Sequence, residues 1–180
     1  MNYIVLDLEA TCWQGHLRSN EQETIEIGAF LLNGYGEVLS SYNRFIRPIL
    51  HPRLSSYCTE LTTIKQENVD RAKKFGPIIE EFQDWAEIFE ENYMLCSWGA
   101  FDKKILQHDC RLHDIDDDWL EHFIDLKQQY REIKRLSHPI GLKAAIRHEG
   151  FEFDGLHHRA ITDAQNLVKI FLEYRDIWRI

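Results

Sequence analysis

The sequence predicts an α/β domain of three layers, in which a mixed sheet of about five strands lies between helices. Three runs with the composition of strands come first, at 3–10, 24–33 and 38–46, and a turn signal at 33–36 joins the last two as a hairpin. Helical and strand-like segments then alternate, which is typical of parallel strands connected by crossover helices. The sheet is therefore expected to begin antiparallel and to continue parallel.

The later elements follow from the spacing of apolar residues. Pro48 and Pro52 break the strand pattern, and we expect 54–69 to form a loop with short helices. From Pro77 to Phe89, apolar side chains recur at helical spacing, with Pro77 suited to the first turn of a helix. The other expected elements are strands at 93–98 and 123–126 and helices at 101–112, 142–148 and 161–174.

Length and composition indicate one domain, spanning 1–180, with a substantial core. The chain has 180 residues, of which 44% are hydrophobic and 12% aromatic, and no stretch approaches the roughly 20 apolar residues of a membrane helix. The first residues lack the pattern of a secretory signal, so we expect a cytoplasmic protein. The four cysteines form no C-x-x-C pair, which argues against a zinc ribbon or a thioredoxin-like redox motif.

The charge of the chain restricts its partners. A formal net charge of −9 counts against a protein that coats nucleic acid, because surplus Lys and Arg normally meet phosphate backbones. Much of the acid lies in runs such as 114–118, which we expect to be a solvated loop.

Asp7 and Glu9 interrupt the first apolar strand. Two residues apart on a strand, their side chains leave the same face, with Cα atoms roughly 6.5 to 7 Å apart. Carboxylates in a core strand are costly unless paired, and a bound cation is one compensation. The alternative is that both lie beyond the buried part of the strand and face water.

A third carboxylate, Asp102, follows the strand at 93–98. Ligands in α/β sheets gather at the carboxyl ends of parallel strands, so Asp102 is expected to approach Asp7 and Glu9. An acid at a helix start also favours the helix dipole, and that alternative remains open for Asp102 taken alone.

The segment 157–163 contributes His158 and Asp163, which are five residues apart. They cannot share one helical face, but they can converge if His158 lies in the loop before the last helix and Asp163 lies in its first turns. Taken singly, His158 and Asp163 are better explained as a surface histidine and another helix-start acid. The combination of four carboxylates and one histidine is more specific, because Mg²⁺ and Mn²⁺ prefer oxygen ligands and a histidine can deprotonate water near neutral pH.

These residues resemble the DEDDh branch of the DnaQ-like exonucleases, which have a ribonuclease-H-like fold. The resemblance rests on D-L-E-A-T at 7–11, F-D at 101–102 and H-x-x-x-x-D at 158–163. Further residues, at 47–48, 58–62 and 157–160, are similar to a narrower group. That group contains the histone-mRNA 3′ exonuclease, the enhanced-RNAi exonucleases and the bacterial sporulation-inhibitor proteins.

The resemblance implies a role for each residue. Asp7 would bind both of two Mg²⁺ or Mn²⁺ ions, Glu9 and Asp163 the ion that holds the nucleophilic water, and Asp102 the other ion largely through water. His158, and not His157, has the implied spacing to Asp163 and would be the general base. The terminal nucleotide would be gripped by four residues, Ala10, Thr11, Leu61 and Thr62.

Other residues near the motifs suggest contacts with a nucleic acid. Trp13 and Phe101 could stack on bases, although most aromatic residues of the chain must belong to the core. Basic residues near the motifs could meet phosphates or form an ordinary exposed face: Lys103, Lys104, Lys143, Arg147 and Arg159.

The expected function is metal-dependent hydrolysis of terminal phosphodiesters, 3′ to 5′, releasing nucleoside 5′-monophosphates. Two divalent ions would add +4 to the charge of −9 and leave −5, and local field rather than net charge governs substrate approach. We expect single-stranded or short 3′ ends, with RNA favoured over DNA, and neither a membrane nor an obligate protein partner. The alternative is a non-hydrolytic nucleic-acid-binding or regulatory module on the same fold.

Overall fold

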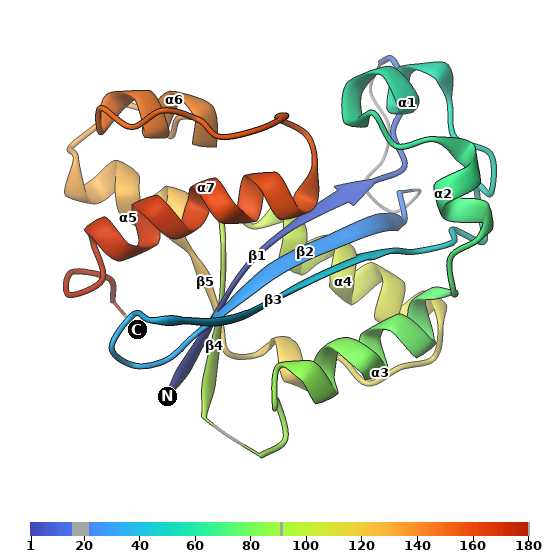
Figure 1. Ribbon diagram of the computed structural model, residues 1–180, viewed down its shortest axis with the longest axis horizontal. Helices are drawn as coiled ribbons and strands as arrows, with labels where there is room; N and C mark the ends of the chain where they lie inside the picture. Colours follow the sequence, from blue (N-terminus) through green and yellow to red (C-terminus); the bar gives the residue numbers. More distant parts are fainter. Residues whose placement is uncertain (16–21, 91, 180) are drawn as a thin grey trace.

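A computed structural model describes residues 1–15, 22–90 and 92–179 and contains one five-stranded mixed sheet (Figure 1). The strand order is β3-β2-β1-β4-β5. β1 pairs antiparallel with β2, and β2 with β3, whereas β4 and β5 add in parallel on the other side of β1. The strands are β1 (Asn2–Ala10), β2 (Thr24–Leu32), β3 (Val38–Phe45), β4 (Tyr93–Ser97) and β5 (Phe123–Asp125).

Helices cover both faces of the sheet, which confirms the three-layer α/β prediction (Figure 1). One face packs against α3 and α4, and the other against α5, α6 and α7. The short helices α1 and α2 cover a separate small cluster beyond the end of β1. The helices are α1 (Ser56–Thr62), α2 (Gln66–Asp70), α3 (Phe75–Trp85), α4 (Phe101–Leu112), α5 (Leu126–Ile133), α6 (Leu142–His148) and α7 (Ala160–Glu173).

Two helices differ from the sequence prediction. α3 ends at Trp85, because the backbone turns at Glu87, whose φ is 53°, and Phe89 is consequently 77% exposed. α5 was not predicted. Its N-cap is Asp125, whose side chain accepts a hydrogen bond from the backbone of Gln128, and its buried face holds only Leu126 and Tyr130.

The alternation of β1 decides where its two acids point. Ile4, Leu6 and Leu8 pack into the core under α3 and α4, whereas Val5 packs toward α7. Asp7 and Glu9 continue the row of Val5, because side chains alternate across a strand. Both acids therefore lie on the α7 face of the sheet.

Gly28 brings α7 close to these acids. It is the register partner of Asp7 on β2, and a Cβ added there would lie 2.2 Å from the backbone nitrogen of Ile161. No other residue type fits this crossing, so the backbone at the start of α7 lies directly on β2. None of the described helices has the length and apolar character needed to cross a membrane.

Candidate active site

Asp7, Glu9 and Asp163 form a compact group of carboxylates. One oxygen of each lies within 4.8 Å of the others, although two come from β1 and the third from the first turn of α7. The register that places Gly28 beside Asp7 brings the start of α7 across to them. The structure thus brings together three of the four acids that the sequence singled out.

Asp102 approaches the same group from α4. The parallel pairing of β1 with β4 ends at Val5, so the backbone N–H of Leu8 has no partner from β4. Asp102, which is buried at the start of α4, accepts the hydrogen bond from this N–H at 3.2 Å. Asp102 is outside the three-carboxylate group found among the described residues, but its charge acts on Asp7.

The acids raise one another's pKa values. Burial, followed by the charges of Asp102, Asp163 and Glu9, raises the pKa of Asp7 well above its ordinary value. Burial and the charges of Asp163 and Glu26 raise the pKa of Glu9 to about 9. Burial raises the pKa of Asp102 to about 7 despite its hydrogen bonds. Such crowding is relieved by a divalent cation, and carboxylate oxygens are the ligands that Mg²⁺ and Mn²⁺ prefer.

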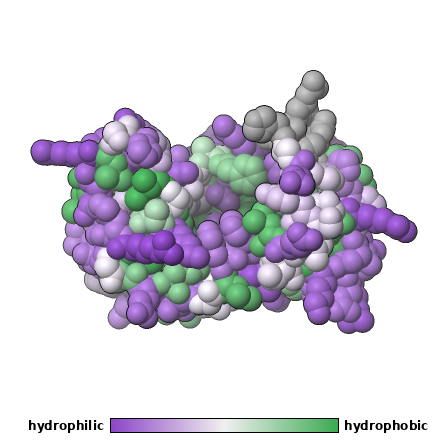
Figure 2. Space-filling model, turned by 90° about the horizontal axis from the view of Figure 1, so that it is seen from above, coloured by the Kyte–Doolittle hydropathy of each residue, from purple (hydrophilic) through white to green (hydrophobic). Residues whose placement is uncertain are grey.

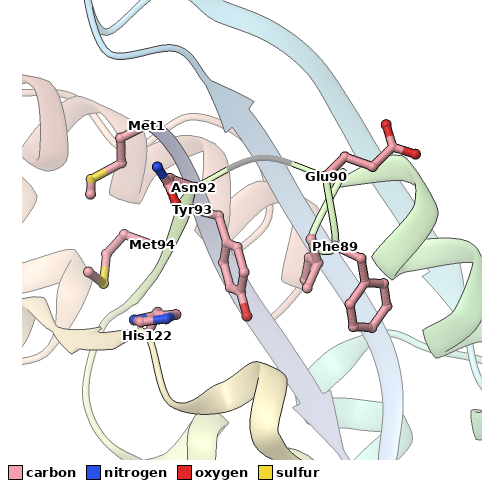
Figure 3. Close-up of a pocket in the computed structure, with 8 residues that line it drawn as sticks. Met1, Phe89, Glu90, Asn92, Tyr93, Met94 and His122 are labelled. Atoms are coloured by element: carbon pink, nitrogen blue, oxygen red, sulfur yellow. The ribbon is translucent and has the colours of Figure 1, made fainter.

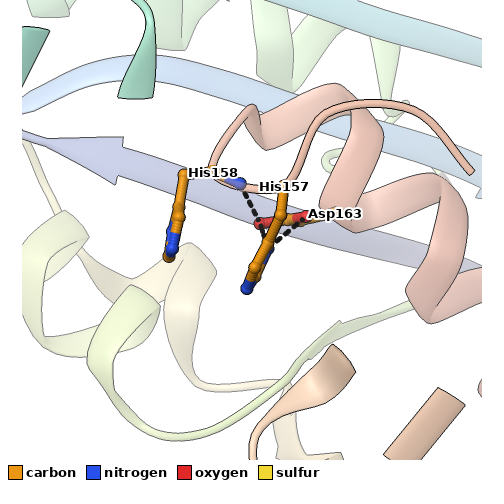
Figure 4. Close-up of side chains that lie close together, drawn as sticks. All are labelled: His157, His158 and Asp163. Carbon is orange, nitrogen blue, oxygen red and sulfur yellow. Dashed lines mark hydrogen bonds and ion pairs between the residues drawn. The ribbon is translucent and has the colours of Figure 1, made fainter. Parts of the chain in front are cut away.

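His157 and His158 both lie beside Asp163 (Figure 4). Nδ1 of His157 is 3.0 Å from each carboxylate oxygen of Asp163, whereas His158 donates its backbone N–H to Asp163 at 3.1 Å. The two rings stack with centroids 3.9 Å apart. His158 precedes α7 in a loop, with φ at 66°. Spacing alone singled out His158, and only the structure shows that His157 pairs with the acid.

The environment of His158 favours its neutral form. Burial, followed by the charges of His157 and Lys143, lowers the pKa of His158 below its ordinary value, although Asp163 acts in the opposite direction. A neutral imidazole can accept a proton, which a general base requires.

The residues expected to grip a nucleotide divide into two kinds. The hydroxyl of Thr11 accepts a hydrogen bond from the backbone of Glu23, and the hydroxyl of Thr62 donates to the carbonyl of Cys58. Ala10, Thr11 and Thr62 are buried, whereas Trp13 and Leu61 are partly exposed and Phe101 is 44% exposed. The accessible apolar surface at these positions therefore comes from Trp13, Leu61 and Phe101.

Thr63, directly after α1, has a strained backbone. Its φ is 61°, in the left-handed region, and its exposed side chain is β-branched. A non-glycine residue loses roughly 1–2 kcal/mol there. Thr63→Gly is therefore expected to raise the free energy of unfolding by about 1 kcal/mol, measured by urea denaturation. Thr59→Gly, inside α1, is the control and should lower it, and an equal loss at both positions would contradict the explanation.

Sequence reasoning missed a buried ion pair beside the acids. Glu26 is fully buried on β2, opposite Glu9, and its carboxylate binds the guanidinium of Arg159. An acid inside the apolar run at 24–32 was the available signal for Glu26. The sequence predicts a phosphate contact or an ordinary exposed face for Arg159, whereas the structure places its side chain in an ion pair with Glu26.

The surface is hollowed above this region. In the view from above (Figure 2), a hollow with both polar and apolar surface lies between the part built by α6 and α7 and the part that carries α1. The carboxyl end of β1 lies between the same two parts (Figure 1). A substrate would thus reach the carboxylates between α1 and the last helices.

A different cavity, of about 460 Å³, lies at the other end of the sheet (Figure 3). Its lining includes Met1, Tyr93 and His122, from the amino ends of β1 and β4 and the residue before β5. Glu90 is the one carboxylate among its described lining residues. Its described lining residues therefore form no cluster of carboxylates like the one at the end of β1.

Comparison with protein families decides the assignment. The family model described as Exonuclease (RNase_T) matches residues 4–171. The chain belongs to this exonuclease family. ERI1 exoribonuclease 2 of Xenopus laevis is 31% identical over 189 residues, which cover 93% of this chain and 27% of that protein. The chain spans about a quarter of the length of the first curated relatives that it matches.

Solved exonuclease structures share the fold. The nuclease domain of 3′hExo, a DEDDh family member bound to rAMP, is similar with a TM-score of 0.89 at 26% identity, over 97% of this chain and 92% of that one. A 3′-exonuclease that recognises the 3′ end of histone mRNA stem-loop has a TM-score of 0.90 at 25% identity, over 97% and 81%. The resemblance to the DEDDh exonucleases and to their ribonuclease-H-like fold is confirmed. Family membership and the carboxylate donor set both indicate dependence on a divalent metal.

Proposed function

We propose that this chain is a metal-dependent 3′–5′ exonuclease that hydrolyses the terminal phosphodiesters of single-stranded or short RNA. The main support is the group formed by Asp7, Glu9 and Asp163, whose oxygens lie within 4.8 Å of one another. RNA is favoured over DNA because relatives of this chain are 3′–5′ exoribonucleases and one neighbouring structure holds rAMP. The products would be nucleoside 5′-monophosphates, released by a single domain spanning 1–180.

The four acids would hold two Mg²⁺ or Mn²⁺ ions. Asp7 lies within 4.8 Å of Glu9 and Asp163, and the charge of Asp102 also acts on it, so Asp7 is assigned to contact both ions. Divalent ions bound there would lower the pKa of a water molecule and stabilise the charge that develops on the scissile phosphate. Asp102 is held in place by the N–H of Leu8 and limits the site on the side of α4.

His158 would accept the proton of the attacking water at an unprotonated ring nitrogen. Its lowered pKa keeps the ring neutral at physiological pH, and its loop position leaves the ring beside Asp163 without a side-chain bond to it in the described residues. His157, which contacts Asp163 through Nδ1, would orient that acid.

The terminal nucleotide would be bound mainly by stacking. Phe101, directly before Asp102 in the chain, is 44% exposed, and Trp13, which follows β1, is partly exposed. Bases of single strands stack on aromatic faces with about 1 to 3 kcal/mol each. Stacking needs unpaired bases, and a net charge of −9 gives little support for holding a long duplex. Both features favour single-stranded or short ends.

Oligonucleotides labelled at either end would test the proposal. With Mg²⁺ or Mn²⁺, a 5′-labelled RNA should shorten stepwise, a 3′-labelled RNA should release labelled mononucleotide first, and EDTA should stop both reactions. Matched DNA should be cut more slowly. Internal cuts would reject an exonuclease, and binding without metal-dependent shortening would favour a non-hydrolytic module.

A further inference from the structure

Glu26 makes three hydrogen bonds with Arg159 and with Ala160, the first residue of α7. Its oxygens accept from Nε of Arg159 at 3.0 Å, from a terminal nitrogen of Arg159 at 2.7 Å and from the backbone N–H of Ala160 at 3.1 Å. The carboxylate is fully buried on β2. A bidentate contact of this kind fixes direction as well as distance, because both groups are planar.

Arg159 occupies the N-cap position of α7, between the histidine and the first helical residue. Its backbone carbonyl accepts the hydrogen bond from the backbone N–H of Asp163 at 2.9 Å, and its guanidinium lies over the ring of Phe45, 5.3 Å from the centroid. The side chain is 25% exposed, so most of it is committed to contacts inside the protein. Arg159 thus connects β2 and β3 to the turn of chain that carries Asp163.

The guanidinium of Arg159 also lies next to the carboxylates of the candidate site. Glu26 and Glu9 are register partners on β2 and β1, and Arg159 feels the charge of both. Without a guanidinium, two buried acids would face each other across the strands, and such an unpaired charge is expensive. Gly28 allows the start of α7 to lie against β2, and the ion pair then sets where along β2 it lies.

We propose that Glu26 and Arg159 are positioning residues that set His158 and Asp163 relative to Asp7 and Glu9. This inference rests on the proposed exonuclease function. It assigns Arg159 to an internal role rather than to a substrate phosphate, since three of its contacts, with the carboxylate of Glu26 and the ring of Phe45, are within the protein. Neither residue is assigned a contact with the reacting atoms. Each would act through the segment that carries His158 and the start of α7.

The test compares kinetics on a labelled RNA for Glu26→Gln, Arg159→Gln and Arg159→Lys. Each Gln variant should lower kcat by about 10- to 100-fold, the range for losing a group that orients metal ligands, with KM for RNA within about twofold of wild type. Arg159→Lys keeps the positive charge but not the bidentate geometry of the guanidinium, so its kcat should fall less than that of Arg159→Gln. A phosphate contact would instead raise KM in the Arg159 variants and leave Glu26→Gln near wild type.

The double variant tests whether the two residues act together. Glu26→Gln/Arg159→Gln should lose about as much kcat as one single variant, because each single change already breaks the pair. Arg44→Gln is the matched control. Arg44 lies on β3 and forms an ion pair with Glu81 of α3, and both side chains are partly exposed. This variant should leave kcat and KM unchanged.

Calorimetric titration with Mn²⁺ gives a readout that does not need turnover. Glu26→Gln and Arg159→Gln should bind Mn²⁺ more weakly by about 10- to 100-fold, Arg159→Lys should lose less affinity, and Arg44→Gln should bind like wild type. If Glu26→Gln fails to fold, as judged by circular dichroism, the comparison of Arg159→Gln with Arg159→Lys decides the question. Wild-type kcat and Mn²⁺ affinity in folded variants would overturn the inference, whereas an inactive wild-type protein would count against the proposed function instead.

Discussion

Asp7→Asn is expected to reduce mononucleotide release by at least a factor on the order of 10³, which is the upper range for losing one group that stabilises transition-state charge. Asp7 lies where the charges of Asp102, Asp163 and Glu9 converge, so its loss removes the ligand that both ions would share. The fold should survive, because Asn occupies nearly the same volume.

The same substitution should stabilise the metal-free protein. The pKa of Asp7 is raised by burial and by the like charges of four neighbouring acids, so folding with this carboxyl costs free energy at any pH above its ordinary value of 3.8. The cost disappears as the pH falls through that value, because the carboxyl is then protonated in both states. The melting temperature of Asp7→Asn in EDTA should therefore exceed that of wild type at pH 8, and the difference should shrink toward pH 4.

Asp116→Asn is the control for both effects. Asp116 is an exposed acid in the loop at 114–118, and its substitution should change neither turnover nor the melting temperature appreciably. An Asp7→Asn protein that melts well below wild type in EDTA would show that Asp7 is a structural residue. Wild-type activity of Asp7→Asn would show that the reaction does not need Asp7 as a metal ligand.

His158→Ala is expected to lower kcat by about 10²- to 10⁴-fold, the range for losing a general base, while affinity for the oligonucleotide stays nearly constant. The reason is that His158 would act on the proton of the attacking water and not on substrate binding. Burial, His157 and Lys143 lower the pKa of His158 below its ordinary value of 6.5, so the loss of wild-type activity that comes from protonation of His158 should begin below pH 6.5. This acid limb should be absent from the residual activity of His158→Ala.

His157→Ala is the informative comparison, because the two histidines are adjacent and stacked. Nδ1 of His157 contacts Asp163, so its loss should weaken Mn²⁺ binding by about 10- to 100-fold and keep the acid limb. Reversed results, with His157→Ala losing the acid limb, would transfer the role of base to His157. Rates would be measured on 5′-labelled RNA at saturating Mn²⁺.

Local pattern was sufficient for most of the fold. Alternation and helical spacing placed five strands and α3, α4, α6 and α7, because a buried face repeats along the chain at the period of the element. The pattern did not predict α5, because its buried face holds only Leu126 and Tyr130. The end of α3 was placed too late because Ile88 continues the apolar spacing after the backbone has turned at Glu87.

The sequence by itself determined which strand face and which chain segments carry the acids. Asp7 and Glu9 share a face because of strand geometry, and the spacing of His158 and Asp163 required a loop before a helix, which is what the structure contains. These are short-range consequences of backbone geometry, and they depend on no distant residue.

Only the tertiary structure decided how distant segments meet. Leu8 and Asp102 are 94 residues apart, and Glu26 and Arg159 are 133 residues apart. Such pairings depend on strand register and on the close contact that Gly28 permits, and neither leaves a repeating signal in the sequence. The sequence therefore specified which groups could bind a metal, while packing of α7 against β2 determined that they converge and which histidine side chain pairs with Asp163.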